Sequence, residues 1–497
     1  MNSFIAIDIG TSSARSLAFS TKGILLHSES IAYAIQSPLA GWQEQDPEII
    51  FRGVLLTLQK IIKKAEGQIL GLCISAAMHS ILAVDESGKA LTPCILWADT
   101  RAQSYAETLK RSTAGRAIYR HTGTPIHPMS PLCKIAWLRD DQPEVFKRTH
   151  RFVGIKEYIL FRLFGQWWID HSIASATGMF DIKKLHWYAP ALEFAGISPA
   201  QLPEPVPTNF ILPNLKSEIS KHWGIPATLP FVIGASDGCL ANLGAVALKK
   251  GETVVTLGTS AAVRMSCQEP VHDEQERIFN YFLADDLYIA GGASNNGGIV
   301  YQWFAEAFLA EGQSKKAALN AINKIEAIPA GAEGLLFLPY LLGERAPVWD
   351  ALASGAFLGV QKHHHKIHFQ RAVLEGILMN VLQIAKILEA TVGEIERIYA
   401  NGGLSQIAVL MQILADQFGK PIHVQRNEEA SAFGAFLMGM RSLGLLDHFE
   451  AARSFVQIEH IYKPDPARQA VYQKLFAIFE QLYPTLKNDF ERLHALK

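Results

Sequence analysis

The stretch that decides the fold is FIAIDIGTSSARSLAF, residues 4–19. Apart from Asp8, residues 4–9 are apolar and rich in β-branched side chains, which predicts a buried strand with one carboxylate inside it. Gly10 permits a tight turn in which the next backbone N–H groups converge on an anion. A carboxylate beside such a phosphate cradle suggests a hydrated Mg²⁺ between them, whereas an ordinary hairpin capped by Asp8 is the alternative. The hairpin offers further donors on four side chains: Thr11, Ser12, Ser13 and Arg15.

The second half of the chain repeats this pattern of a strand, a glycine turn and a second strand. Residues 252–264 read ETVVTLGTSAAVR, again a strand, a Gly-Thr-Ser turn and a strand. A single such turn is common by chance, but a matched pair half a chain apart is much less so. Two phosphate-binding hairpins that face each other across a cleft would hold a nucleotide polyphosphate, and Thr259 would be a contact in the second.

Size and composition limit the class of protein. A chain of 497 residues is too long for one core, so two or three domains are expected. Hydrophobic residues make up 49% and charged residues 19%, as in a compact globular enzyme rather than a disordered chain. Because the net charge is -1, nothing favours nucleic acid or an anionic membrane surface as a partner.

The cysteines and the apolar runs indicate the compartment. The 5 cysteines are scattered and odd in number, which predicts reduced thiols in a cytoplasm, with neither a zinc site nor a disulfide framework. The N-terminus runs directly into the first strand, so we expect no secretory leader. The longest apolar run, residues 335–342, contains Pro339 and is too short to cross a bilayer.

Hairpins alternate with helical crossovers, which predicts an α/β fold with polar site residues after buried strands. His79 follows the strand predicted at residues 69–76, and a satisfied core histidine is its alternative. Asp237 follows the strand predicted at residues 230–234, where it would cap a helix or act as a general base. Gly402 and Gly403 follow a third strand and would leave room for a flat base, or simply make a tight turn.

Several nucleotide-binding motifs are absent. The sequence contains no Gly-x4-Gly-Lys-Ser/Thr loop and no Gly-x-Gly-x-x-Gly after a strand. A P-loop kinase, a Rossmann dehydrogenase and a protein kinase are therefore disfavoured.

Taken together, these residues resemble the FGGY carbohydrate kinases of the actin-like ATPase superfold, over essentially the whole chain. The first phosphate motif of that family resembles residues 8–12. Its first signature resembles MSPLCKIAWLRD at residues 129–140, and its second resembles GAFLGV at residues 355–360 with His368, Phe369 and Ala372 downstream. Asp141 departs from the first signature, where an amide, Glu or His is usual.

The resemblance implies two actin-like (ribonuclease H-like) ATPase domains, 1–245 and 246–497, with the site in the cleft between them. It implies ATP and Mg²⁺, with Asp237 as catalytic base and Asp8 as the carboxylate that holds the hydrated metal. Carried over by position, the phosphate contacts are Thr11, Ser12, Ser13, Arg15 and Thr259. The nucleotide contacts are Gly298, Gln302 and Gly403, beside Gly402, and the polyol contacts are Met78, His79 and Met129.

Within the family, residues 124–132 and 154–158 are most similar to gluconokinases, and xylulokinases or other pentulokinases are the closest alternative. The expected reaction is therefore ATP-dependent phosphorylation of a sugar acid or polyol at a terminal hydroxyl, with D-gluconate giving 6-phosphogluconate as the favoured case. A non-catalytic actin-like nucleotide switch is the alternative of another class, and a homodimer stays open. A buried carboxylate needs a cation, which His79, His127 or Lys156 would supply, and Lys156 is the one expected to stay charged.

Overall fold

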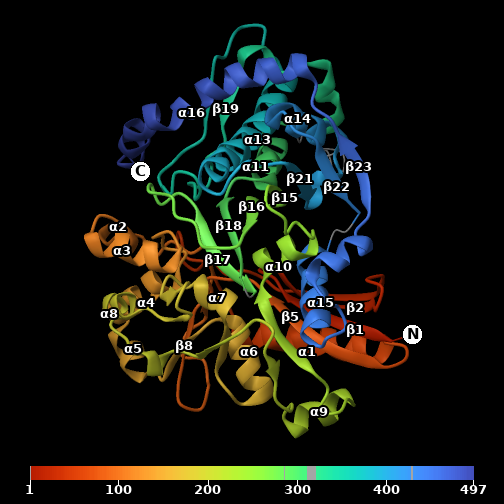
Figure 1. The fold of residues 1–497 in the computed structure, drawn as a ribbon. Coiled ribbons are helices and arrows are strands. Elements are labelled where there is room, and N and C mark those ends of the chain that lie inside the picture. Colours follow the sequence, from red (N-terminus) through yellow and green to blue (C-terminus); the bar gives the residue numbers. More distant parts are fainter. Residues whose placement is uncertain (1, 285, 310–320, 427–428, 497) are drawn as a thin grey trace.

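Two mixed β-sheets, one from each half of the chain, form the frame of the protein (Figure 1). The computed structural model describes residues 2–284, 286–309, 321–426 and 429–496. The first sheet, in spatial order, consists of β13 (Ile211–Leu212), β14 (Phe231–Ser236), β5 (Ile69–Ala76), β1 (Ser3–Ile9), β2 (Ser13–Ser20) and β3 (Leu25–Ala32). The second consists of β17 (Phe279–Ala284), β18 (Leu287–Ser294), β16 (Ala261–Cys267), β15 (Glu252–Leu257), β21 (Arg397–Asn401), β22 (Ile422–Gln425) and β23 (Ile458–Tyr462).

The first sheet brings three chain segments together at one edge. β1 runs parallel to β5, and β5 runs parallel to β14, so the carboxyl ends of all three strands meet there. Ile9 pairs with Ala76, and Ala76 pairs with Ser236. The side chains that follow these strands, among them His79 and Asp237, are therefore neighbours although they lie far apart in sequence.

The second sheet repeats the topology of the first. β15 and β16 form an antiparallel hairpin, as β1 and β2 do, and β15 then runs parallel to β21 and β21 to β22. The Gly10 N–H donates to Ser13 O in the first turn, and the Gly258 N–H donates to Ser260 O in the second. The matched hairpins predicted from the sequence are thus equivalent elements of two similar sheets.

Helices cover the outer faces of both sheets. α1 (Pro47–Lys64) packs against β2 and β3, and its cap is the predicted one, because Asp46 accepts a hydrogen bond from the Glu48 N–H. α13 (Lys366–Thr391), α14 (Ala408–Phe418) and α16 (Pro466–His494) gather around the second sheet (Figure 1). Among the described residues, no helix is both long and apolar enough to traverse a lipid bilayer.

Two helices fill the space between the sheets, α10 (Asp237–Gly244) and α15 (Ala430–Ser442) (Figure 1). They cross closely because glycines face the contact: a Cβ on Gly434 would lie 1.9 Å from Leu240 O, and one on Gly244 would lie 2.1 Å from Ala430 O. α15 belongs to the second half of the chain, yet it packs on β1 and β5 of the first sheet. The second predicted domain, 246–497, therefore contributes a helix to the core of the first.

The helix that begins after Gly154 encloses two charged side chains. α6 (Ile155–Phe164) is buried along most of its length, including Lys156 and Glu157. Sequence periodicity marks apolar faces, whereas these two charged side chains are enclosed by surrounding tertiary elements.

Candidate active site

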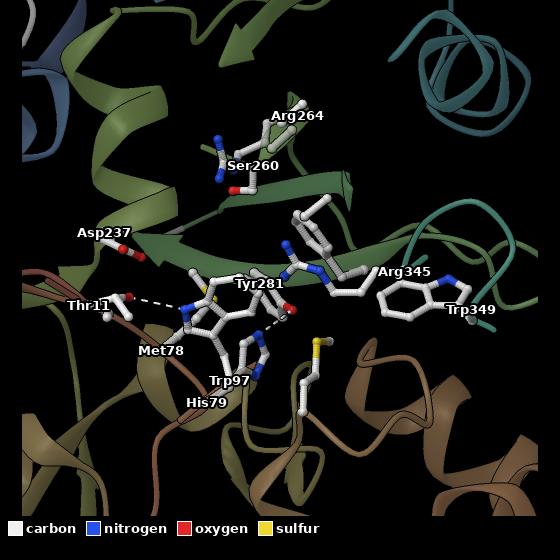
Figure 2. A pocket seen from close by; sticks show the side chains of 16 residues that line it. Thr11, Met78, His79, Trp97, Asp237, Ser260, Arg264, Tyr281, Arg345 and Trp349 are labelled. Atoms are coloured by element: carbon white, nitrogen blue, oxygen red, sulfur yellow. Dashed lines mark hydrogen bonds between the residues drawn. The ribbon is translucent and has the colours of Figure 1, made fainter. Parts of the chain in front are cut away.

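A pocket of about 180 Å³ lies between the two sheets, and both halves of the chain line it (Figure 2). Ser260 and Arg264 enter it from the second hairpin, while Asp237 stands at the start of α10. From the first half come Thr11, Met78, His79, Trp97, Met129 and Asp237; from the second come Ser260, Arg264, Phe279, Tyr281, Arg345 and Trp349. The structure thus brings five of the predicted residues to one pocket: Thr11, Met78, His79, Met129 and Asp237.

Asp8 lies beneath the first hairpin and is almost fully buried. Its Oδ1 accepts a hydrogen bond of 2.7 Å from Ser75 Oγ, and its Oδ2 accepts one of 2.5 Å from Arg15 Nη2. Arg15 also pairs with Glu429 at the start of α15, so its charge is balanced by two carboxylates. A hydrogen bond from Trp97 Nε1 to Thr11 Oγ1, 3.1 Å long, ties the turn to the pocket wall (Figure 2).

Asp237 is the first residue of α10, and Ser236 occupies the cap position before it. Its Oδ1 accepts the N–H of Gly238 at 2.7 Å, and the side chain faces the pocket (Figure 2). Burial, together with the charge of Asp8, raises the pKa of Asp237 to about 6, although Arg264 and the Gly238 N–H act in the opposite direction. Such a carboxyl group exchanges a proton near neutral pH, as a general base must.

Arg264 balances the charge of Asp237. Its Nη1 donates to Thr256 Oγ1 at 3.2 Å, and burial lowers its pKa while Asp237 raises it. Gly238 allows this approach, since a Cβ there would lie only 3.2 Å from Arg264 Nη2. The guanidinium therefore lies close to Gly238, the residue after the acidic group, and lines the pocket with it.

His79 and Tyr281 join the two halves of the chain at the pocket. His79 Nδ1 donates to Ala176 O at 2.8 Å, and its Nε2 accepts the Tyr281 hydroxyl at 3.1 Å (Figure 2). Burial lowers the pKa of His79 to about 3, so the imidazole is neutral near pH 7. His79 thus contributes a neutral polar edge to the pocket rather than a cation.

Arg345 lies at the other side of the pocket from Asp237, with its guanidinium 4.5 Å from the centre of the Trp97 ring (Figure 2). Its Nη2 donates a long hydrogen bond, 3.4 Å, to Ser294 O. Trp349 stands beside it and forms an edge contact with the His127 ring. Aromatic rings and a guanidinium together make this end of the pocket suited to a polar, flexible ligand with an anionic group.

A second chamber of about 460 Å³ adjoins the pocket and shares Trp97, Ser260 and Arg345 with it. Thr259 and His127 line this chamber, together with Asn295 and Leu342. Burial and the charge of Arg345 hold the pKa of His127 well below 6.5, so it too is neutral near pH 7.

Lys156 does not line either chamber. It is 1% exposed, and its Nζ lies 2.7 Å from Asp170 Oδ2 and 3.4 Å from Ala235 O. Its charge is already balanced inside the fold, so this placement does not support the prediction that Lys156 meets a substrate carboxylate. The sequence could not reveal this, because the pairing with Asp170 depends on the packing of α6 against β9 (Trp168–Asp170).

Comparison with known proteins decides the family. A model of the FGGY family of carbohydrate kinases, N-terminal domain, matches residues 3–244, and its C-terminal counterpart matches residues 253–443. The chain belongs to the FGGY family of carbohydrate kinases. Membership in a family of carbohydrate kinases makes it an enzyme, with ATP implied as phosphoryl donor, and removes the alternative of a non-catalytic switch.

The kinase is similar to proteins of two substrate classes. It is 40% identical to a gluconokinase of Bacillus subtilis (strain 168), over 98% of its own length and 97% of that relative. Crystal structures of a gluconate kinase and of a ligand-bound xylulose kinase, both from Lactobacillus acidophilus, superpose with TM-scores of 0.94 at 33% identity. The first comparison covers 99% of each chain, and the second covers 99% of this chain and 100% of the other.

The glycines predicted to contact nucleotide gather around the second hairpin of the kinase. The Gly298 N–H donates to Gly258 O at 2.8 Å, and a Cβ on Gly402, whose φ is +90°, would lie 2.5 Å from Leu257 O. Gly402 is thus required by the fold itself, whereas a Cβ on Gly403 would meet nothing within 4 Å. Gln302, on α11 (Gly298–Phe304), donates to Glu306. Open space beside Gly403 is compatible with a bound base.

The remaining predicted phosphate contacts are at the first turn. Ser12 is exposed, its carbonyl accepts the Tyr33 N–H, and the Ser13 carbonyl accepts the Gly10 N–H. Neither residue lines the two chambers, and their role as phosphate contacts remains a prediction.

Sequence analysis missed the cations and most of the aromatic rings that line the pocket. Arg264 lies on the second strand of the second hairpin, where it pairs with Val254, whereas Arg15 pairs with Asp8 nearer its turn, so the repeat did not mark Arg264. Arg345 belongs to a polar turn with no motif of recognised chemistry, and only the fold brings it to the cleft. The missed rings are Trp97, Phe279, Tyr281 and Trp349.

Proposed function

We propose that this FGGY kinase transfers the γ-phosphoryl group of ATP to the terminal hydroxyl of D-gluconate, giving 6-phosphogluconate. The observation that carries the proposal is Asp237, a carboxylate with a pKa raised to about 6 that faces an interdomain pocket. The similarity to gluconokinases over nearly the whole chain supports the choice of substrate.

In the proposed reaction, Asp237 accepts the proton of the attacking hydroxyl group. The carboxylate of Asp237 is ionised above pH 6. The nearby charge of Arg264 stabilises the ionised form, yet the pKa of Asp237 stays at about 6, so the group can still take up a proton near neutral pH. Phosphoryl transfer has a loose transition state, so most of the catalysis comes from aligning the hydroxyl with the phosphorus and balancing charge. Thr11 and Ser260, on the two hairpin turns, line the pocket where phosphate would enter.

The residues of the first hairpin fit a hydrated Mg²⁺. Asp8 and Asp237 are close enough for the charge of one to raise the pKa of the other, and both offer hard oxygen ligands. A divalent cation would relieve that repulsion, with Asp8 as the residue that holds it through water. When bound, the metal would balance the charge of the polyphosphate.

Xylulose is the second candidate substrate, since the xylulose kinase structure is as similar as the gluconate kinase structure. The two candidates differ in charge: gluconate carries a carboxylate and xylulose does not. An aromatic pocket that contains two guanidiniums, the partly buried Arg264 and the buried Arg345, favours the anionic substrate. The free state of all 5 cysteines agrees with the reducing compartment in which we propose that the enzyme works.

A substrate panel tests the proposal. Purified enzyme with Mg²⁺ and ATP is assayed for ADP release with gluconate, xylulose, ribulose, glycerol and fuculose at equal concentrations. The highest kcat/KM is expected for gluconate, with 6-phosphogluconate identified by mass and by oxidation with 6-phosphogluconate dehydrogenase. A higher kcat/KM for xylulose would replace the substrate while leaving the family assignment intact.

A further inference from the structure

Arg345 is a buried cation whose donors are poorly satisfied. It is 8% exposed, and among the described residues its side chain forms a single hydrogen bond, the 3.4 Å contact with Ser294 O, and none at its Nε. Among the described residues, no carboxylate forms an ion pair with it. A buried guanidinium normally binds a carboxylate or phosphate, because burying a charge without a hydrogen-bonded counter-ion is costly.

The adjacent Glu344 does not fill this role. Its Oε2 accepts hydrogen bonds from Ser294 Oγ, Asn296 Nδ2 and Asn380 Nδ2, and its Oε1 accepts from two backbone N–H groups. Glu344 offsets part of the charge of Arg345 without bonding to its guanidinium, which uses one donor, on Nη2, for Ser294 O. The fold therefore holds Arg345 in place while most of its donors remain available to a ligand.

The other cations near the cleft have different surroundings. Arg264 donates to Thr256 Oγ1 and interacts through its charge with Asp237, the residue at which phosphoryl transfer is proposed. Lys156 pairs with Asp170, and Lys134 Nζ donates to the carbonyl oxygens of His79 and Leu96. Among the described residues, neither Arg264 nor Arg345 is bonded to a carboxylate, and Arg345 is the pocket-lining cation that lies away from Asp237 (Figure 2).

Arg345 and Asp237 lie at opposite sides of the same pocket, with Trp97, Tyr281 and His79 between them (Figure 2). An extended polyhydroxy acid that presents its terminal hydroxyl to Asp237 has its carboxylate at the other end of the chain. We propose that Arg345 binds the carboxylate of the sugar acid substrate and so selects aldonic acids over neutral sugars. This inference rests on the proposed function and assigns one residue to the choice of substrate class.

The test compares two substrates that differ only at one carbon, gluconate and glucitol, in which a CH₂OH group replaces the carboxylate. Arg345→Gln keeps a hydrogen-bond donor near Ser294 O but removes the charge. Arg345→Lys keeps the charge but loses the planar guanidinium, which can donate two parallel hydrogen bonds to a carboxylate. In Arg345→Gln the KM for gluconate should rise roughly ten- to hundred-fold, the range of a charge-assisted contact. The KM values for glucitol and for ATP should change less than three-fold, and Arg345→Lys should restore part of the affinity for gluconate.

Binding without turnover gives an independent readout. Trp97 lies under the guanidinium, so gluconate binding in the absence of ATP should change tryptophan fluorescence in the parent enzyme and much less in Arg345→Gln. Circular dichroism and thermal melting establish that each variant is folded; should Arg345→Gln not fold, Arg345→Lys carries the same comparison with a smaller expected rise.

Two outcomes would overturn the inference. If Arg345→Gln raises the KM equally for gluconate and glucitol, Arg345 shapes the pocket but does not bind the carboxylate. If the KM for ATP rises instead, Arg345 binds the polyphosphate. Failure of the proposed function looks different: the parent enzyme itself would prefer xylulose, and Arg345→Gln would then leave the preference between gluconate and glucitol unchanged.

Discussion

Replacing Asp237 with Asn should inactivate the enzyme and at the same time stabilise it. The amide keeps the shape of the side chain but cannot accept a proton, and removal of a general base typically lowers kcat by about 10²–10⁴-fold. At about 1.4 kcal/mol for each tenfold change, this raises the barrier by roughly 3–5 kcal/mol.

The expected gain in stability follows from the raised pKa. A rise from 3.8 to about 6 means that the folded state holds the proton more tightly than the unfolded state, by about 3 kcal/mol. The stabilisation by the proton is full below pH 3.8 and is lost as pH rises through 6. At pH 7.5 the ionised Asp237 therefore destabilises the fold. Because its side chain is partly exposed and Arg264 loses a counter-charge in the variant, we expect Asp237→Asn to gain about 1–2 kcal/mol.

Two assays test the reasoning together. ADP release from pH 5 to 8.5 should show kcat of the parent falling below pH 6 as the base is protonated, and denaturant unfolding should show a larger gain for Asp237→Asn at pH 7.5 than at pH 5. Asp416→Asn is the matched control, because that buried carboxylate accepts three hydrogen bonds, one of them from Arg468, and its loss should destabilise the fold without affecting kcat. Retained turnover in Asp237→Asn, or a loss of stability at pH 7.5, would refute the argument.

Three further predictions concern the remaining parts of the site. Asp8→Asn should raise the Mg²⁺ concentration needed for half-maximal activity and move the acidic limb of the pH profile to lower pH, since Asp8 raises the pKa of Asp237; an unchanged Mg²⁺ titration would count against the assignment. Lys156→Met should lower the free energy of unfolding by about 3–5 kcal/mol, because Asp170 is left buried and unpaired, while the KM for gluconate of the folded enzyme stays within two-fold. Gly403→Ala should raise the KM for ATP without changing the melting temperature, whereas Gly402→Ala should lower the melting temperature; equal effects of the two would argue against a nucleotide beside Gly403.

Much of the frame could be predicted from the sequence because local chemistry controls it. The run of apolar residues before Gly10 makes β1, the turn glycines make both hairpins, and Asp46 with Pro47 starts α1 where the pattern indicates. The repeat of the Gly-Thr-Ser turn predicted two related halves, and the two sheets have that topology. These features depend on residues that are neighbours in the sequence, so they can be predicted from the sequence alone.

Tertiary structure decided which side chains face the cleft and which charges are already balanced. Lys156 looked like a free cation in the sequence, but Asp170, from another element, neutralises it inside the core. Arg345 carried no signal at all, and it matters because the fold leaves most of its donors unused beside Trp97. Electrostatic pairing depends on distances between segments that are far apart along the chain. The sequence by itself therefore predicted the family, the hairpins and the proposed base, whereas only the folded structure showed that Lys156 is paired inside the core and that Arg345 lines the pocket without a bonded carboxylate.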